Sequence, residues 1–138
     1  MTTQKELNDL TYKIIGAAIE VHKELGPGLL ESIYEKCQAL LLKEQGINVE
    51  QQKKVPVIFH GVELDCELRY DLLVNDLIIV ELKAVEAMLP VFEAQLLTYM
   101  KLLQKPKGIL INFNCMNIYK EGQQTMVNEL FAALPKGY

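Results

Sequence analysis

The chain has 138 residues, of which 50% are hydrophobic and 23% charged, and its formal net charge is −4 at pH 7. This length suffices for a conventional core, so we expect residues 1–138 to form a single domain. The apolar runs are too short to span a bilayer, and the N-terminus does not resemble a secretory signal. The sequence therefore predicts a cytoplasmic protein without membrane contact. The negative net charge and the presence of a single arginine, Arg69, argue against a broad positively charged surface that binds nucleic acid.

The cysteines and histidines point to no metal centre of their own. Cys37, Cys66 and Cys115 are too few and too widely spaced for a disulfide framework or a four-thiolate site, so core filling is the better interpretation. His22 and His60 have no second histidine at metal-ligand spacing, which argues against a zinc site.

Two amphipathic helices are predicted in the first third of the chain. Thr3 and Glu6 form a capping-box pattern, and apolar residues then recur at helical spacing until Gly26 and Pro27. A second helix is predicted from about Gly28, with Gly46 as its C-terminal cap. Its apolar stripe is expected to comprise Leu30, Ile33, Tyr34, Cys37, Leu40 and Leu41.

Turn residues divide the middle of the chain into two predicted hairpins. His60 and Gly61 separate strands at 55–59 and 62–68, and Asn75 and Asp76 separate strands at 71–74 and 77–82. Together these strands would form an antiparallel meander.

The last third of the chain predicts a helix, a strand and a closing helix. The helix begins at Pro90 and stops before Pro106, residues 108–113 read as a buried strand, and residues 127–134 read as the closing helix. A strand, a crossover helix and a strand favour one parallel pairing. The expected fold is therefore α/β, with a mixed central sheet, an antiparallel meander plus one parallel strand, flanked by helices.

The chemistry concentrates at the end of the second hairpin. Asp71 and Glu81 supply the hard oxygen ligands that magnesium prefers, and the Leu82 backbone carbonyl is a further candidate ligand. Side chains alternate along a strand, so Glu81 and Lys83 share a face. A Glu and a Lys two apart are often only a surface ion pair, but here they follow an apolar run typical of a strand covered on both faces.

Strand register decides whether the two carboxylates can meet. A plain two-residue loop at Asn75 and Asp76 would set Asp71 opposite Val80, and Glu81 would then point to the other face. We therefore predict either a three-residue loop that includes Leu77, which sets Asp71 opposite Glu81, or a β-bulge near Asp71.

These residues carry a family resemblance. Asp71, then Glu81-Leu82-Lys83, then Gln95 and Tyr99 on the following helix resemble the PD-(D/E)xK nuclease superfamily with the Q-x-x-x-Y motif of its RecB-like branch. Residues 28–34, with Gly28, Glu31 and Tyr34, match the pattern that names the bacterial GxxExxY protein family. The resemblance implies a restriction-endonuclease-like core and Mg²⁺- or Mn²⁺-dependent cleavage of DNA or RNA.

The resemblance also implies a role for each motif residue. Asp71 and Glu81 match the metal ligands, Lys83 matches the catalytic lysine, and Glu31 resembles the helical glutamate that completes the acidic cluster, directly or through water. Gln95 and Tyr99 would flank the site. From the sequence alone, an exposed Glu31, a surface Gln95 and a core Tyr99 remain alternatives.

Partner and activity hypotheses stay open at this point. A basic rim for nucleic acid is expected from Lys101, Lys105 and Lys107, with Lys53 and Lys54 as further candidates, although a solvated face explains them equally well. Besides an active nuclease, the sequence allows a nuclease fold kept only for binding nucleic acid or protein, or a structural partner of a larger assembly. The oligomeric state, a homodimer included, is also open.

Overall fold

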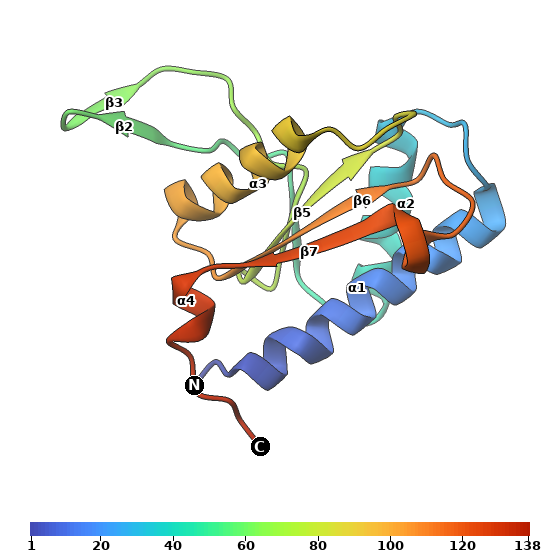
Figure 1. Cartoon of the computed structure of the whole chain (residues 1–138), viewed down its shortest axis with the longest axis horizontal. Coiled ribbons are helices and arrows are strands. Elements are labelled where there is room, and N and C mark those ends of the chain that lie inside the picture. The colour runs from blue at the N-terminus through green and yellow to red at the C-terminus, as the bar shows by residue number, and fades with distance from the viewer.

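A five-stranded sheet forms the centre of the computed structural model, which describes residues 1–138 (Figure 1). Its strands lie in the order β1-β4-β5-β6-β7, and only β5 and β6 run parallel. The strands are β1 (Val49–Gln51), β4 (Leu72–Val74), β5 (Ile78–Lys83), β6 (Lys107–Asn112) and β7 (Gln123–Val127). The helices are α1 (Gln4–Leu25), α2 (Glu31–Glu44), α3 (Pro90–Leu103), α4 (Glu129–Ala132) and the π-helical turn η1 (Ile118–Gly122). The predicted mixed α/β fold is confirmed.

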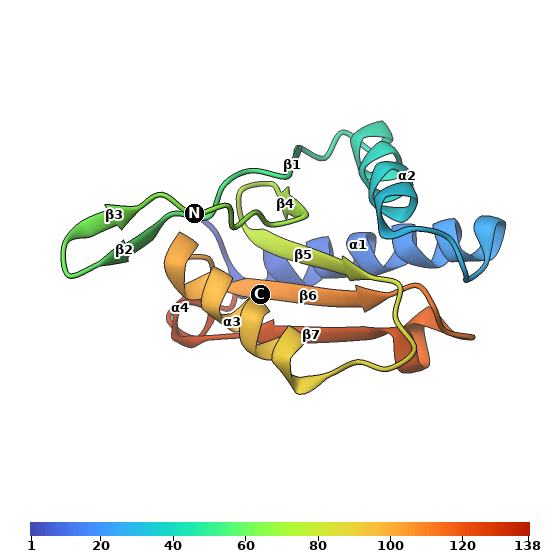
Figure 2. The ribbon, with the colours of Figure 1, turned by 90° about the horizontal axis from the view of Figure 1, so that it is seen from above.

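Helices cover both faces of the sheet because its central strands are apolar on both sides. In Figure 2, α3 lies on one side of the sheet and α1 on the other. Leu72, Val80 and Ile109 pack with α1 and α2, whereas their neighbours Leu73, Ile79 and Leu110 pack with α3. Burial on both faces is typical of strands whose sequence is a continuous run of apolar residues. None of the helices combines the length and hydropathy that a membrane span requires.

The helix ends follow the predicted capping signals with one shift. Thr3 Oγ1 accepts the N–H of Glu6 at 3.1 Å, and α1 ends before Gly26, as predicted. α2 begins at Glu31 rather than about Gly28, because Gly28 has a φ of +99° and lies outside the helical region. α2 ends in a Schellman motif in which Gly46 donates to Lys43 O and Ile47 to Leu42 O.

The apolar stripe predicted for α2 is only partly confirmed, since Tyr34, Cys37 and Leu41 pack in or against the core. The buried positions are Tyr34, Gln38, Ala39 and Leu42, whereas Leu30, Ile33 and Leu40 are exposed. Tyr34 stacks on Phe113 with ring centroids 4.4 Å apart, and Gln38 Nε2 donates to Ile14 O of α1 at 2.9 Å. These two contacts fix the rotation of the helix.

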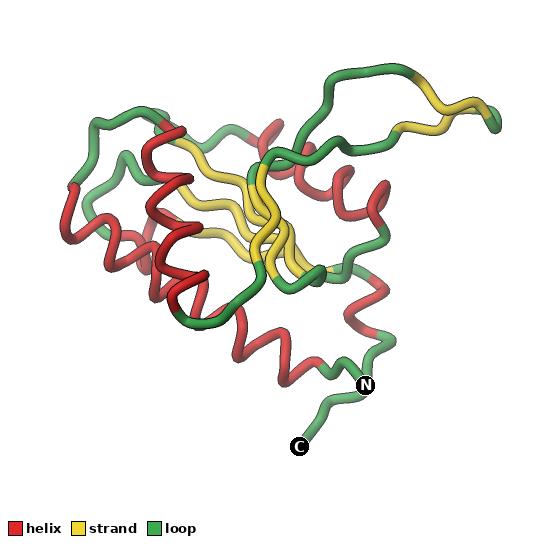
Figure 3. The backbone as a smooth tube through the Cα atoms, turned by 180° about the vertical axis from the view of Figure 1, so that it is seen from behind, coloured by secondary structure: helices red, strands yellow, loops and turns green.

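The first predicted hairpin forms, but outside the central sheet. β2 (Val57–Phe59) and β3 (Val62–Leu64) pair around the predicted His60-Gly61 turn and form an arm that projects from the body (Figure 3). Phe59 at its end is 63% exposed. The predicted meander is therefore wrong here, because β1, which the sequence patterns missed, occupies the free edge of β4.

The second hairpin confirms the predicted register shift. Val74 pairs with Ile78, so Asn75, Asp76 and Leu77 form a three-residue loop, with positive φ at Asn75 and Asp76. Leu72 pairs with Val80, and the next step along the same register sets Asp71 opposite Glu81.

The last third of the chain contains two elements more than predicted, η1 and β7. α3 begins at Pro90 and ends before Pro106, and β6 runs parallel to β5, as predicted. Residues 123–127, however, form β7, and the closing helix shrinks to Glu129–Ala132. Asn128 causes the break, since its side chain accepts the N–H groups of Leu130 and Phe131 and caps the helix.

Packing between β6 and α3 makes a glycine obligatory at position 108. A Cβ at Gly108 would lie 2.8 Å from Leu96 Cδ1 and 2.8 Å from Met100 Sδ. We predict that Gly108→Ala lowers the free energy of unfolding by about 1–3 kcal/mol, the usual cost of overpacking. Gly16→Ala is the control, because no atom lies within 4 Å of that position and alanine favours a helix by up to about 1 kcal/mol. Urea titrations that showed equal effects would contradict this packing argument.

Candidate active site

Asp71 and Glu81 meet where β4 begins and β5 ends. Asp71 Oδ2 accepts the backbone N–H of Leu82 at 2.8 Å, and its Oδ1 accepts a hydrogen from Gln52 Nε2 at 3.0 Å. Both oxygens of Asp71 are therefore oriented by donors that do not neutralise its charge. The register places Glu81 across from it on the α3 face of the sheet.

Glu81 is a buried acid without full hydrogen bonding. Its side chain is 5% exposed, and its Oε1 has no hydrogen-bond partner. Burial, and then the neighbouring charge of Asp71, raise the pKa of Glu81 to about 9, while Lys83 acts in the opposite direction. In the metal-free protein this carboxyl group is therefore neutral at pH 7.

Lys83 ends β5 and shares the face of Glu81. Its Nζ lies 4.6 Å from the centroid of the Phe92 ring, at the start of α3. This aromatic face holds the ammonium group by a cation–π interaction. Asn112 at the end of β6 fixes the loop that follows β5. Its Oδ1 accepts the N–H of Val85, and its Nδ2 donates to Val85 O.

Glu31 is brought to the same edge by the first turn of α2. Partial burial raises the pKa of Glu31, the charge of Asp71 raises it further, and the charge of Lys83 lowers it. Glu31 is thus within electrostatic reach of both groups, yet its side chain is exposed. The side chains of Glu31, Asp71 and Glu81 do not form a cluster close enough to hold a metal ion together.

Gln95 and Tyr99 lie one helical turn apart on α3, and Tyr99 is near enough to Glu81 and Asp71 to feel their charges. Gln95 Nε2 donates to the Tyr99 hydroxyl at 3.2 Å, as expected for residues one helical turn apart. Burial raises the pKa of Tyr99, and the charges of Glu81 and Asp71 add to this effect. Tyr99 is therefore a core residue whose hydroxyl side faces the acids, and Gln95 is exposed beside it.

Three of the five lysines predicted to form a basic rim lie away from the carboxylate pair, whereas Lys53 and Lys54 follow Gln52 and pair with Glu50 and Asp65. Lys107 is 4% exposed, donates to Asn8 Oδ1 at 2.9 Å, and pairs in register with Ile78 at the start of β5. Five residues of strand, about 16 Å, separate that register position from Lys83. Lys105 pairs with Asp76 in the β4–β5 turn, and Lys101 lies in the last turn of α3. Lys101, Lys105 and Lys107 are not beside the carboxylate pair, because the end of α3 and the start of β6 lie at the opposite end of the sheet from Lys83.

Sequence reasoning missed two groups around the site. Gln52 donates to Asp71 and is itself held by Glu35 of α2, and the aromatic ring of Phe92 contacts the Lys83 ammonium group. Glu35 follows Glu31 by one helical turn, which signals a shared helix face. No local pattern marks Gln52, whose position depends on the unpredicted strand β1.

The donor set fits a hard divalent cation. Two carboxylates face one another, and one buried carboxyl oxygen has no partner, an arrangement that is costly unless a cation or a proton compensates it. A family model described as the PD-(D/E)XK nuclease superfamily matches residues 8–125. The match covers most of the chain, so the chain belongs to this superfamily. No curated protein and no solved structure matches it.

Glu81 should make the stability of the metal-free protein depend on pH. Because its pKa rises from 4.5 to about 9 on folding, its favourable contribution is complete below about 4.5 and is lost as pH rises through 9. In chelator, the free energy of unfolding should fall by up to about 1.4 kcal/mol per pH unit across this window relative to Glu81→Gln. Parallel pH profiles for the two proteins in urea titrations would refute the buried neutral acid.

Proposed function

We propose that the chain is a metal-dependent nuclease that hydrolyses phosphodiester bonds in DNA or RNA with Mg²⁺ or Mn²⁺. The observation that carries the proposal is the buried, unpartnered Glu81 oxygen beside the oriented Asp71 carboxylate. A protein has little reason to bury an acid in this state unless a ligand completes it. Membership of the nuclease superfamily gives the ligand a chemical class.

Asp71 and Glu81 are the proposed protein ligands of the cation, with the Leu82 carbonyl as a third. The N–H and C=O of one strand residue point toward the same neighbouring strand. Since the Leu82 N–H points to Asp71, its carbonyl faces the same side, where β4 has not yet begun. Glu31, which is exposed and one step further out, would reach the cation through water.

The remaining side chains position the reactants. When bound, the cation would polarise the phosphate and favour ionisation of a nearby water. Lys83, held against Phe92, is placed to orient that water and to neutralise charge on the phosphate. The Gln95 amide and the Tyr99 hydroxyl, joined by a hydrogen bond, provide polar groups on the α3 side for a phosphate or for Lys83.

The turn before α2 supports assignment to the GxxExxY family within the superfamily. The Tyr34 hydroxyl donates to Gly26 O at 2.6 Å and accepts the Leu29 N–H at 3.1 Å. Gly28 adopts a φ of +99°, which favours glycine. These contacts fix the point at which α2 begins and therefore where Glu31 lies, so the glycine, glutamate and tyrosine of the motif act as one unit.

A nuclease fold kept only for binding is the second candidate. It is favoured by the net charge of −4 and by the absence of a third direct acidic ligand. Metal-dependent cleavage by the purified chain separates the two candidates, because a binding module would retain nucleic acid without cutting it.

Glu81→Gln tests the nuclease proposal directly. We expect cleavage of single-stranded DNA, duplex DNA or RNA in Mn²⁺ to fall at least about 100-fold, because a bound cation supplies several kcal/mol of transition-state stabilisation. Glu86→Gln is the matched control, since Glu86 is exposed in the loop after β5. Circular dichroism should show both variants folded. Full activity in Glu81→Gln, or no cleavage by the unmodified chain with either metal, would overturn the proposal.

A further inference from the structure

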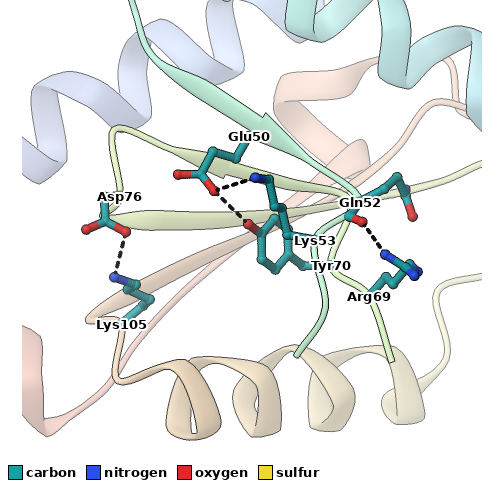
Figure 4. A network of polar contacts seen from close by, with 7 residues as sticks. All are labelled: Glu50, Gln52, Lys53, Arg69, Tyr70, Asp76 and Lys105. Carbon is teal, nitrogen blue, oxygen red and sulfur yellow. Dashed lines mark hydrogen bonds and ion pairs between the residues drawn. The ribbon is translucent and has the colours of Figure 1, made fainter. Parts of the chain in front are cut away.

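Gln52 has a strained backbone that is held from both sides. It follows the last residue of β1 and has a φ of +53°, a region that costs a non-glycine residue about 1 kcal/mol or more. Its N–H donates to Asp71 O at 3.0 Å. Its carbonyl accepts from Arg69 Nη1 at 2.9 Å, as Figure 4 shows. The surrounding chain therefore maintains a conformation that Gln52 alone would avoid.

The side chain of Gln52 links two carboxylates. Its Nε2 donates to Asp71 Oδ1 at 3.0 Å and to Glu35 Oε1 at 2.6 Å. An amide nitrogen carries two hydrogens, one for each acid. Because the Leu82 N–H already holds Asp71 Oδ2, the Gln52 amide fixes the second oxygen and thereby the plane of the Asp71 carboxylate.

Glu35 serves as the anchor of this link. Its Oε2 accepts from Gln51 Nε2 at 3.2 Å, so each of its oxygens is held by one glutamine. Gln124 on β7 is exposed and takes no part in these hydrogen bonds, which makes it the control for the bridge. A neutral amide also orients Asp71 without bringing a positive charge that would repel a cation.

We propose that Gln52 is a positioning residue that aligns the Asp71 carboxylate for cation binding, through a bridge from Glu35 on α2. This inference rests on the proposed function for its purpose, but the alignment itself can be measured without metal or substrate. The strained backbone of Gln52 is what directs its amide between the two acids.

The test uses the Leu82 amide proton, observed by NMR in the metal-free chain, as the reporter of Asp71 orientation. Gln52→Gly removes the side chain while tolerating the positive φ, and Gln52→Glu keeps the size but removes both donors. Gln124→Ala is the control. We expect the Leu82 proton to shift upfield in both Gln52 variants and to stay in place in Gln124→Ala. The Mn²⁺ affinity, measured by calorimetry, should weaken about tenfold in Gln52→Gly and stay unchanged in Gln124→Ala.

The outcomes separate this inference from the proposed function. An unmoved Leu82 resonance, or unchanged Mn²⁺ affinity in Gln52→Gly, would overturn the positioning role. If the unmodified chain binds no Mn²⁺ but the Leu82 resonance moves in both Gln52 variants, the proposed function fails and the alignment of Asp71 by Gln52 stands. Loss of Mn²⁺ affinity in Gln124→Ala to the same extent would also count against a specific role for Gln52.

Discussion

The three-residue loop between β4 and β5 is the constraint on which the site depends. By pairing Val74 with Ile78, it sets Leu73 and Ile79 toward α3 and their neighbours toward α1 and α2. The same register brings Asp71 and Glu81 together. A slip of one residue would exchange the apolar side chains of the two buried faces, force both layers to repack and separate the acids, so one turn determines both packing and chemistry.

Stability and chemistry oppose one another at Glu81. An apolar strand with a buried, incompletely bonded carboxyl group is less stable than one with a hydrophobic residue there. The cost is tolerable because the surrounding sheet is covered on both faces and the helices fix its edges. A cation at this site would convert a destabilising group into a ligand, which couples folding energy to metal binding.

Local signals predicted those elements that short-range chemistry controls. Thr3 capped α1, Pro90 opened α3, and Gly61 turned the first hairpin as expected, because each acts through its own backbone. Contacts between residues far apart in the sequence could not be predicted from these local signals. β1 has only three residues, and the rotation of α2 depends on the distant Phe113. Within the site, alternation placed Glu81 and Lys83 correctly, whereas the contacts of Gln52 needed the tertiary structure.

The projecting β2–β3 arm is a loop inserted between two strands that already pair with each other. β1 precedes the arm and β4 follows it, and the Lys54–Arg69 bridge closes its base. A break in the chain at the exposed end of the arm would therefore leave both halves joined through the β1–β4 ladder and the shared core. Local unfolding of the arm would likewise leave the carboxylate pair in place. This region can therefore vary in length and sequence without altering the sheet that carries the acids.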